Sequence, residues 1–271
     1  MPELPEVETT LRGIAPHIEG QIINGVEIRE SRLRWPIPEN LGSLISGRRI
    51  GRPERRAKYL LLPIDGAGTL IIHLGMSGSL RIVDQSLAPR KHDHVDLRLS
   101  NGSSLRYHDP RRFGCLLLTD TPASHALIKD LGPEPLASTF NGAYLHGLSR
   151  GRKTAIKTFV MDGHVVVGVG NIYASESLFR AGISPLRLAG EVSLQRYEKL
   201  AIAIREVLEA AIQQGGTTLR DFVNPEGKPG YFRQTLKVYE RAGEPCRNCE
   251  TPIRMFRQGQ RATYWCPKCQ R

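Results

Sequence analysis

Apolar residues recur with helical spacing at the start of the chain. Between residues 2 and 19 one face carries Val7, Leu11, Ile14 and Ile18. Pro2 suits the first turn of a helix, and the Glu3 carboxylate suits the positive end of the helix dipole. The pattern therefore predicts an opening helix over residues 2–19.

From about residue 21 to 120 the apolar runs become short and strand-like. Gly, Pro, Asn and Asp separate them, as is typical of turns. The runs are Ile22–Ile28, Tyr59–Leu62, Thr69–His73, Ser79–Val83, Val95–Leu99 and Gly114–Leu118. Short strands without intervening helices favour a β-sandwich. Cys115, in the last run, is interpreted as a buried strand residue without a function.

The pattern turns helical again beyond residues 131–136, a Gly- and Pro-rich stretch that is the best linker candidate. A long stripe, ended by Gly215 and Gly216, predicts a helix; it comprises Leu194, Tyr197, Ala201, Ile204, Leu208 and Ala211. We therefore expect an α+β protein, with a β-sandwich domain over residues 1–132, a linker over 133–136, a helical domain over 137–240 and a C-terminal module over 241–271.

The segment 165–173 imitates a dinucleotide-binding fingerprint, because an apolar run leads through Gly168 and Gly170 into a predicted helix. Tyr173 stands where the fingerprint needs a third small residue, and the alternating strands and helices of such folds are missing. We therefore predict no nucleotide cofactor. A glycine-rich turn leading into a helix would still offer backbone N–H groups to a phosphate.

Four of the five cysteines form two CxxC pairs with sixteen residues between them, which is typical of a four-thiolate zinc ribbon. The predicted ligands of one structural Zn²⁺ are Cys246, Cys249, Cys266 and Cys269. Disulfide bridges are the alternative, and the acidic N-terminus, unlike a secretory signal, argues against the exported location that they would need.

Charge points to a polyanionic partner. The 271 residues contain 38 Lys and Arg against 27 Asp and Glu, a net charge of +11. Nucleic acid is the first expectation and an anionic membrane the second, although no basic amphipathic helix favours a membrane. No stretch approaches the roughly 18 apolar residues of a membrane span. The last 31 residues carry +5 (seven basic minus two acidic), so the metal module is expected to contact nucleic acid.

Six tracts together resemble bacterial formamidopyrimidine-DNA glycosylases: Pro2–Glu8, Arg56–Tyr59, His73–Gly78, Asp109–Gly114, Gly168–Glu176 and the cysteine ribbon. The resemblance implies a helix-two-turn-helix element in the helical domain. It also implies a cytoplasmic, nucleoid-associated, monomeric repair enzyme for damaged double-stranded DNA. Such enzymes excise oxidised purines, namely 8-oxoguanine and formamidopyrimidines, and then cleave the abasic site by β,δ-elimination.

The resemblance assigns catalysis to Pro2, Glu3, Lys58 and Arg261. Removal of Met1, expected before a small side chain, would leave Pro2 with a free amine, and an α-amino group titrates at about 8, far below a lysine. Glu3 matches the acid that protonates the sugar ring oxygen, Lys58 the proton donor in β-elimination, and Arg261 the arginine of phosphate contact and δ-elimination. From the residues alone, Glu3 could equally be a helix-capping carboxylate and Lys58 a solvated lysine.

The same resemblance assigns DNA contacts. The residues that fill the gap left by an extruded base match Met76, Arg111 and Phe113, although a lone Met or Phe usually belongs to a core. The backbone contacts match His92, Arg152 and Asn171. Lys153 and Lys157, taken singly, are expected on a solvated basic face. Residues 217–232 resemble the loop that closes over the extruded base.

The sequence is also compatible with two other functions. One is an endonuclease VIII-like glycosylase for oxidised pyrimidines, against which Leu4 and the tract His73–Gly78 stand. The other is a non-catalytic zinc-ribbon DNA-binding protein, which would not need Pro2 and Glu3 together with Lys58 and Arg261.

Overall fold

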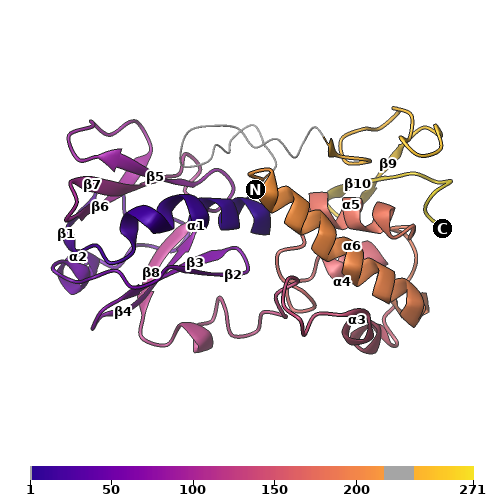
Figure 1. Ribbon diagram of the computed structural model, residues 1–271, viewed down its shortest axis with the longest axis horizontal. Helices are drawn as coiled ribbons and strands as arrows, with labels where there is room; N and C mark the ends of the chain where they lie inside the picture. The colour runs from indigo at the N-terminus through magenta and orange to yellow at the C-terminus, as the bar shows by residue number, and fades with distance from the viewer. Residues whose placement is uncertain (1, 217–234) are drawn as a thin grey trace. The chain divides into compact units, whose positions relative to one another are not determined.

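The computed structural model describes residues 2–216 and 235–271, so the lid tract predicted at 217–232 lies outside the described residues. The chain divides into two compact units (Figure 1). The first is Met1–Lys129, joined by a stretch that begins at Gln214. The second is Asp130–Gln213 with the C-terminal stretch that ends at Arg271. The finer domain and linker boundaries stay predictions.

The first unit is a sandwich of two antiparallel four-stranded sheets, in the orders β1-β6-β7-β5 and β2-β3-β4-β8. The strands are β1 (Ile23–Ile28), β2 (Glu54–Arg56), β3 (Tyr59–Ile64), β4 (Gly68–His73), β5 (Ser79–Asp84), β6 (Asp93–Leu99), β7 (Ser103–His108) and β8 (Cys115–Thr119). The predicted β-sandwich is confirmed, and Cys115 is buried in β8 as expected. The prediction that no helix lies between the strands is wrong, because α2 (Leu41–Ile45) lies between β1 and β2.

The helix α1 (Leu4–Ile18) confirms the predicted opening helix. Its buried face includes Val7, Ile14 and Ile18, which join the core formed between the sheets. It contacts β5 of one sheet and both β2 and β3 of the other. The helix α1 therefore contacts strands of both layers, which fixes it against the sandwich.

The second unit is helical with a small β-hairpin. Its elements are α3 (Gly142–Ser149), α4 (Ile156–Val160), α5 (Asn171–Arg180), α6 (Leu194–Gln213), β9 (Arg254–Gln258) and β10 (Arg261–Trp265), with short 3-10 turns at Pro122–Ser124 in the first unit and Ala189–Glu191 in this one. The long helix α6 packs against α3 and α5. Its predicted stripe is buried except for Leu194, which is 40% exposed at the first turn. No helix in the described part of the chain is long and apolar enough to cross a bilayer.

Candidate active site and nucleic-acid interface

The N-terminal tract is fixed by a capping interaction at the start of α1. The Glu6 carboxylate accepts a hydrogen bond from the backbone N–H of Glu3, at 2.8 Å. Pro2 is buried, and Glu3 is only 5% exposed. The capping interaction sets the direction in which the chain enters the helix, and therefore where the nitrogen of Pro2 and the carboxylate of Glu3 lie.

Lys58 occupies the tip of the tight hairpin between β2 and β3, in which Arg56 pairs with Tyr59. The preceding residue, Ala57, has a positive φ of 55°, a conformation that is uncommon without glycine. Arg55 steadies this turn by donating to the carbonyl of Ala57, at 3.0 Å. The half-buried Lys58 is thereby held at a defined place instead of on a free surface strand.

The pKa of His73 is affected by the positive charge of Lys58. Burial, together with the neighbouring cations Lys58 and Arg34, lowers the pKa of His73 to about 4. The ring is therefore neutral at physiological pH, and its Nδ1 accepts a hydrogen bond from the N–H of Gly75, at 3.0 Å. Lys58 and Arg34 therefore lie close enough to His73 to act on its ring electrostatically.

Two loops carry the three residues matched to gap filling. Met76 lies between β4 and β5 and is 36% exposed, and Phe113 lies between β7 and β8 and is 42% exposed. The Arg111 guanidinium covers the Phe113 ring, with its carbon 4.7 Å from the ring centroid. These side chains stand at exposed loop positions and not in the core, so they can meet a partner.

His92 lies in the turn before β6 with a positive φ of 72°. Its ring packs edge-on against the rings of His94 and His108, with centroids 6.1 and 6.2 Å away. Burial and the adjacent Lys91 lower the pKa of His92. The ring of His92 is partly exposed, so it can face a partner.

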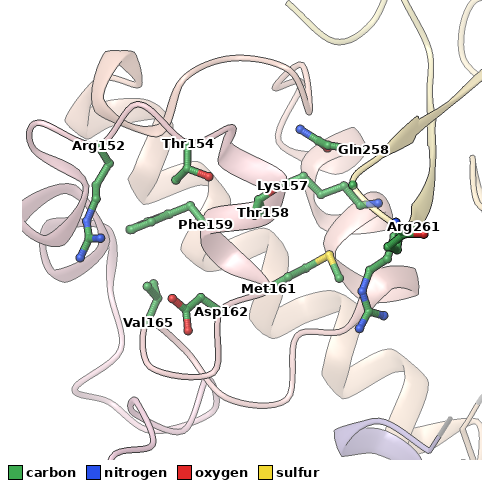
Figure 2. Close-up of a pocket in the computed structure, with 12 residues that line it drawn as sticks. Arg152, Thr154, Lys157, Thr158, Phe159, Met161, Asp162, Val165, Gln258 and Arg261 are labelled. Carbon is green, nitrogen blue, oxygen red and sulfur yellow. The ribbon is translucent and has the colours of Figure 1, made fainter.

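In the second unit, a pocket of about 560 Å³ lies between α4 and the turn that joins β9 to β10. Arg152 and Arg261 reach it from opposite sides in Figure 2, and Lys157 also lines it. Two predicted site residues thus share one concave, positively charged surface.

Lys157 contradicts the expectation of a solvated face. It is 2% exposed, and its ammonium donates to Asn171 Oδ1 at 2.6 Å, to Thr263 Oγ1 at 2.8 Å and to the carbonyl of Ala262 at 3.1 Å. Lys153, in contrast, is exposed as expected. A charge is buried at Lys157 because polar groups from α5 and β10 surround it, which charge counting along the sequence does not reveal.

Asn171 is the first residue of α5, so the predicted glycine-rich turn into a helix is confirmed. Its amide oxygen accepts from Lys157, and its amide nitrogen donates to the carbonyl of Ala262, at 3.0 Å. Asn171 therefore ties the start of α5 to the strand that begins at Arg261. A phosphate at this helix start would meet the backbone N–H groups of the first turn.

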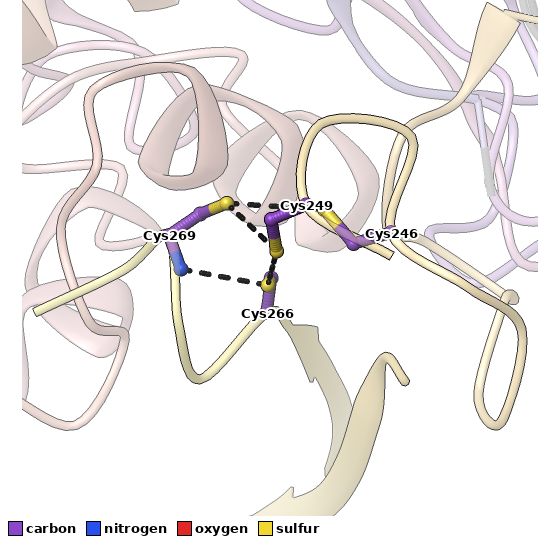
Figure 3. Close-up of side chains that lie close together, drawn as sticks. All are labelled: Cys246, Cys249, Cys266 and Cys269. Atoms are coloured by element: carbon purple, nitrogen blue, oxygen red, sulfur yellow. Dashed lines mark hydrogen bonds between the residues drawn. The ribbon is translucent and has the colours of Figure 1, made fainter. Parts of the chain in front are cut away.

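The four predicted zinc ligands converge. Their sulfur atoms all lie within 4.8 Å of one another (Figure 3). Individual S···S distances are 3.9 Å from Cys246 to Cys269, 3.5 Å from Cys249 to Cys266, and 3.4 Å from Cys249 to Cys269. A tetrahedral Zn²⁺ with sulfur ligands at about 2.3 Å needs sulfur atoms about 3.8 Å apart. The cluster fits this ion.

A buried carboxylate fixes the chain that enters the ribbon. Glu176 accepts hydrogen bonds from the consecutive backbone N–H groups of Lys237, Val238 and Tyr239, at 2.8, 2.9 and 2.9 Å. Burial raises the pKa of Glu176 against the opposing effect of these bonds. This role of Glu176 was not predicted from the sequence, in which Glu176 is only the end of a matching tract.

Comparison with known families assigns the chain. Three family models match successive segments: the formamidopyrimidine-DNA glycosylase N-terminal domain at residues 1–116, its H2TH domain at 131–223, and a zinc finger found in FPG and IleRS at 243–271. The chain belongs to the formamidopyrimidine-DNA glycosylase family. It is accordingly a DNA glycosylase with abasic-site lyase activity and one structural zinc.

Known relatives are similar to this chain in sequence over its full length. The formamidopyrimidine-DNA glycosylase of Methylococcus capsulatus is 64% identical over 272 residues, and that of Xanthomonas euvesicatoria is 59% identical over 271, each covering 100% of both chains. The Thermus thermophilus MutM (Fpg) structure has a TM-score of 0.88 at 38% identity, covering 99% of this chain and 98% of that one.

Solved glycosylase complexes extend the comparison. A Lactococcus lactis Fpg variant bound to Fapy-dG DNA has a TM-score of 0.92 at 33% identity, and MutM bound to carbocyclic 8-oxo-G DNA has 0.91 at 34%, both covering 100% of each chain. The formamidopyrimidine family is thus favoured over the endonuclease VIII-like and non-catalytic alternatives, and the predicted helix-two-turn-helix element and zinc ribbon are confirmed.

Proposed function

We propose that this glycosylase excises 8-oxoguanine and formamidopyrimidines from damaged duplex DNA through an imine on Pro2, and then cleaves the strand by β,δ-elimination. The observation that carries the proposal is the buried Pro2-Glu3 pair, locked to α1 by Glu6, in a chain similar over its whole length to enzymes solved with Fapy-dG and 8-oxo-G DNA.

The first step needs a nucleophile and an acid side by side. Once Met1 is removed, the secondary amine of Pro2 attacks C1′ of the damaged nucleotide, the glycosidic bond breaks with the base as leaving group, and the proton released by the nitrogen passes to the departing base. Glu3 donates a proton to the ring oxygen, which opens the sugar and leaves an iminium ion on Pro2. The fixed positive charge of this iminium acidifies the C2′ proton.

Strand cleavage then follows from the iminium. Loss of the C2′ proton expels the 3′ phosphate in β-elimination, with Lys58 as the proton donor, and a second elimination expels the 5′ phosphate. Arg261 contacts the departing phosphate from the ribbon. The half-buried position of Lys58 and the location of Arg261 beside a positively charged pocket support these roles.

DNA binding completes the proposal. Met76, Arg111 and Phe113 fill the gap left by the extruded nucleotide, and their exposure on neighbouring loops supports this. His92, Arg152 and Asn171 contact the backbone. We further propose that a single subunit acts on each lesion, and that it works in the cytoplasm on nucleoid DNA.

Borohydride trapping tests the central step. The protein is incubated with a duplex that carries one 8-oxoguanine opposite cytosine, reduced, digested and analysed by mass spectrometry. We expect the DNA adduct on the peptide that begins at Pro2. Pro2→Gly is expected to bind the duplex while excision is lost or greatly slowed, and an undamaged duplex serves as the control that yields no adduct.

The outcomes separate the alternatives. Full turnover by Pro2→Gly, or an adduct elsewhere in the chain, would reject Pro2 as the nucleophile. An adduct that forms only with an oxidised-pyrimidine duplex would reject the purine substrate class while keeping the imine chemistry.

A further inference from the structure

Three loops of the first unit converge on one buried acidic residue, Asp109, which is 0% exposed. They are the loop between β4 and β5 with Met76, the turn before β6 with His92, and the loop between β7 and β8 with Arg111 and Phe113. These loops carry four of the six residues matched to DNA contact. Asp109 itself has no assigned function.

The carboxylate of Asp109 joins the two gap-filling loops. One oxygen accepts from the hydroxyl of Ser77, the neighbour of Met76, at 3.1 Å. The other accepts from the backbone N–H of Gly114, the neighbour of Phe113, at 2.9 Å, and also contacts the hydroxyl of Tyr107 at 3.3 Å. A single side chain therefore holds both loops at the residue beside each exposed apolar tip.

The backbone of Asp109 holds the third loop. Its N–H donates to the carbonyl of His92 at 3.1 Å, and its carbonyl lies 2.8 Å from Nε2 of His94. The same carbonyl accepts from the N–H of Arg112, which has a positive φ of 55°. These bonds support two strained positions, His92 and Arg112, in which the chain turns beside a predicted DNA contact.

Glycines let the two gap-filling loops touch through their backbones. Gly75 has a φ of +62°, and a Cβ atom there would lie 2.6 Å from the carbonyl carbon of Phe113 and the nitrogen of Gly114. A Cβ atom on Gly114 would collide with the Tyr107 hydroxyl and the carbonyl of His73. The loops thus pack without room for independent movement, provided that the buried polar groups between them stay paired.

We propose that Asp109 is a positioning residue that holds Met76, Arg111 and Phe113 in one arrangement for filling the gap in the duplex. The inference rests on the proposed function, because it assumes that these side chains enter the duplex. A preformed arrangement matters because exposed loop tips would otherwise lose conformational entropy on each encounter with DNA. Asp109 touches no reacting atom in this role.

The test compares a duplex substrate with one that has no gap to fill. Single-turnover excision is measured on 8-oxoguanine opposite cytosine, and strand cleavage on a single-stranded oligonucleotide with a preformed abasic site. Asp109→Ala is expected to slow duplex excision by about 10- to 100-fold, the scale of misplaced groups, and to leave single-strand cleavage within about threefold. Asp65→Ala, an exposed aspartate of the same unit, is the matched control.

Conservative and double variants give sharper readouts. In Asp109→Asn the amide oxygen can accept from Gly114 and the amide nitrogen can donate to Ser77, so excision is expected within about fivefold of wild type. In a Phe113→Ala background, Asp109→Ala is expected to add less than about threefold, since both changes disable the same element. If Asp109→Ala does not fold, Ser77→Ala removes one of the same hydrogen bonds. It is expected to slow excision from the duplex and to leave cleavage of the single-stranded oligonucleotide unchanged.

The contrary outcomes are distinct. Equal losses on both substrates, no rescue by Asp109→Asn, or fully multiplicative losses with Phe113→Ala would overturn the positioning role and leave the proposed function intact. Wild-type excision by Phe113→Ala together with Met76→Ala would instead reject gap filling by these residues, and the inference with it.

Discussion

The buried ammonium of Lys157 permits a stability prediction with an internal control. Lys157 and Lys153 lie four residues apart, but Lys157 is 2% exposed and Lys153 is on the surface. Replacing each with methionine keeps a long unbranched side chain and removes the charge. We expect Lys157→Met to destabilise the second unit and Lys153→Met to leave its stability nearly unchanged.

The magnitude follows from the acceptors that lose their donor. Asn171 Oδ1 and Thr263 Oγ1 lose the Lys157 ammonium as their donor, whereas the carbonyl of Ala262 keeps its hydrogen bond from the Asn171 amide. A buried acceptor left without a partner costs about 1–3 kcal/mol, and relief of the buried charge offsets part of the total. A net loss of about 3 kcal/mol corresponds to a fall in Tm of roughly 10 °C for a unit of this size.

Differential scanning calorimetry of both variants, with zinc present, measures this difference. DNA binding provides a second readout, because Lys157 also orients Asn171 and the strand that starts at Arg261. Affinity for an abasic-analogue duplex is expected to fall at least tenfold in Lys157→Met. If the two variants melt within about 2 °C of each other, the hydrogen bonds of Lys157 do not stabilise the unit, and the argument is refuted.

Two further predictions concern zinc and pH. Zinc chelation, or Cys249→Ser, is expected to weaken DNA binding at least tenfold in fluorescence anisotropy, because structural zinc supplies folding free energy and the hairpin with Arg261 depends on it; an unchanged Kd would contradict this. His73, with a folded pKa of about 4 against an ordinary 6.5, binds its proton more weakly in the folded state. The free energy of unfolding should therefore fall by about 3 kcal/mol as the pH drops from 6.5 to 4. In His73→Gln this part of the pH dependence should disappear from urea titrations, and an identical profile would count against a buried neutral ring.

Residue spacing in the sequence was sufficient to predict those elements that a single kind of contact determines. The apolar face of α1 and the stripe of α6 are buried because helical spacing aligns them, and the CxxC spacing brought four sulfur atoms together. The strand β7 was missed because its buried positions include Arg106, which is 2% exposed and bonded to Asp96 at 2.7 and 2.8 Å. An arginine in a short run predicts an exposed strand, but carboxylates of β6 and the carbonyls of Leu87 and Ala88 pair with Arg106 and make it a core residue.

The candidate site could also be predicted only in part from the sequence. Exposed residues such as Met76, Phe113 and Arg152 were predicted as DNA contacts through motif resemblance, and the structure adds that the loops of Met76 and Phe113 are hydrogen-bonded to Asp109. What fixes those loops could not be predicted, because Asp109 receives donors from residues 32 and 5 positions away in the chain, Ser77 and Gly114. No local pattern records a hydrogen bond between distant loops.

Buried carboxylates hold loops and turns in place in both units of this strongly basic protein. Asp109 accepts from Ser77 and Gly114 in the first unit, and Glu176 accepts from three successive backbone N–H groups in the second. A carboxylate suits the purpose because it offers several acceptor sites to N–H and O–H groups that a turn leaves unpaired. Arg and Lys side chains on one surface repel one another, and the two carboxylates bond segments that carry such side chains, near Arg112 and Lys237. We therefore expect variants of Asp109 and Glu176 to change DNA recognition, although both side chains are buried in the protein.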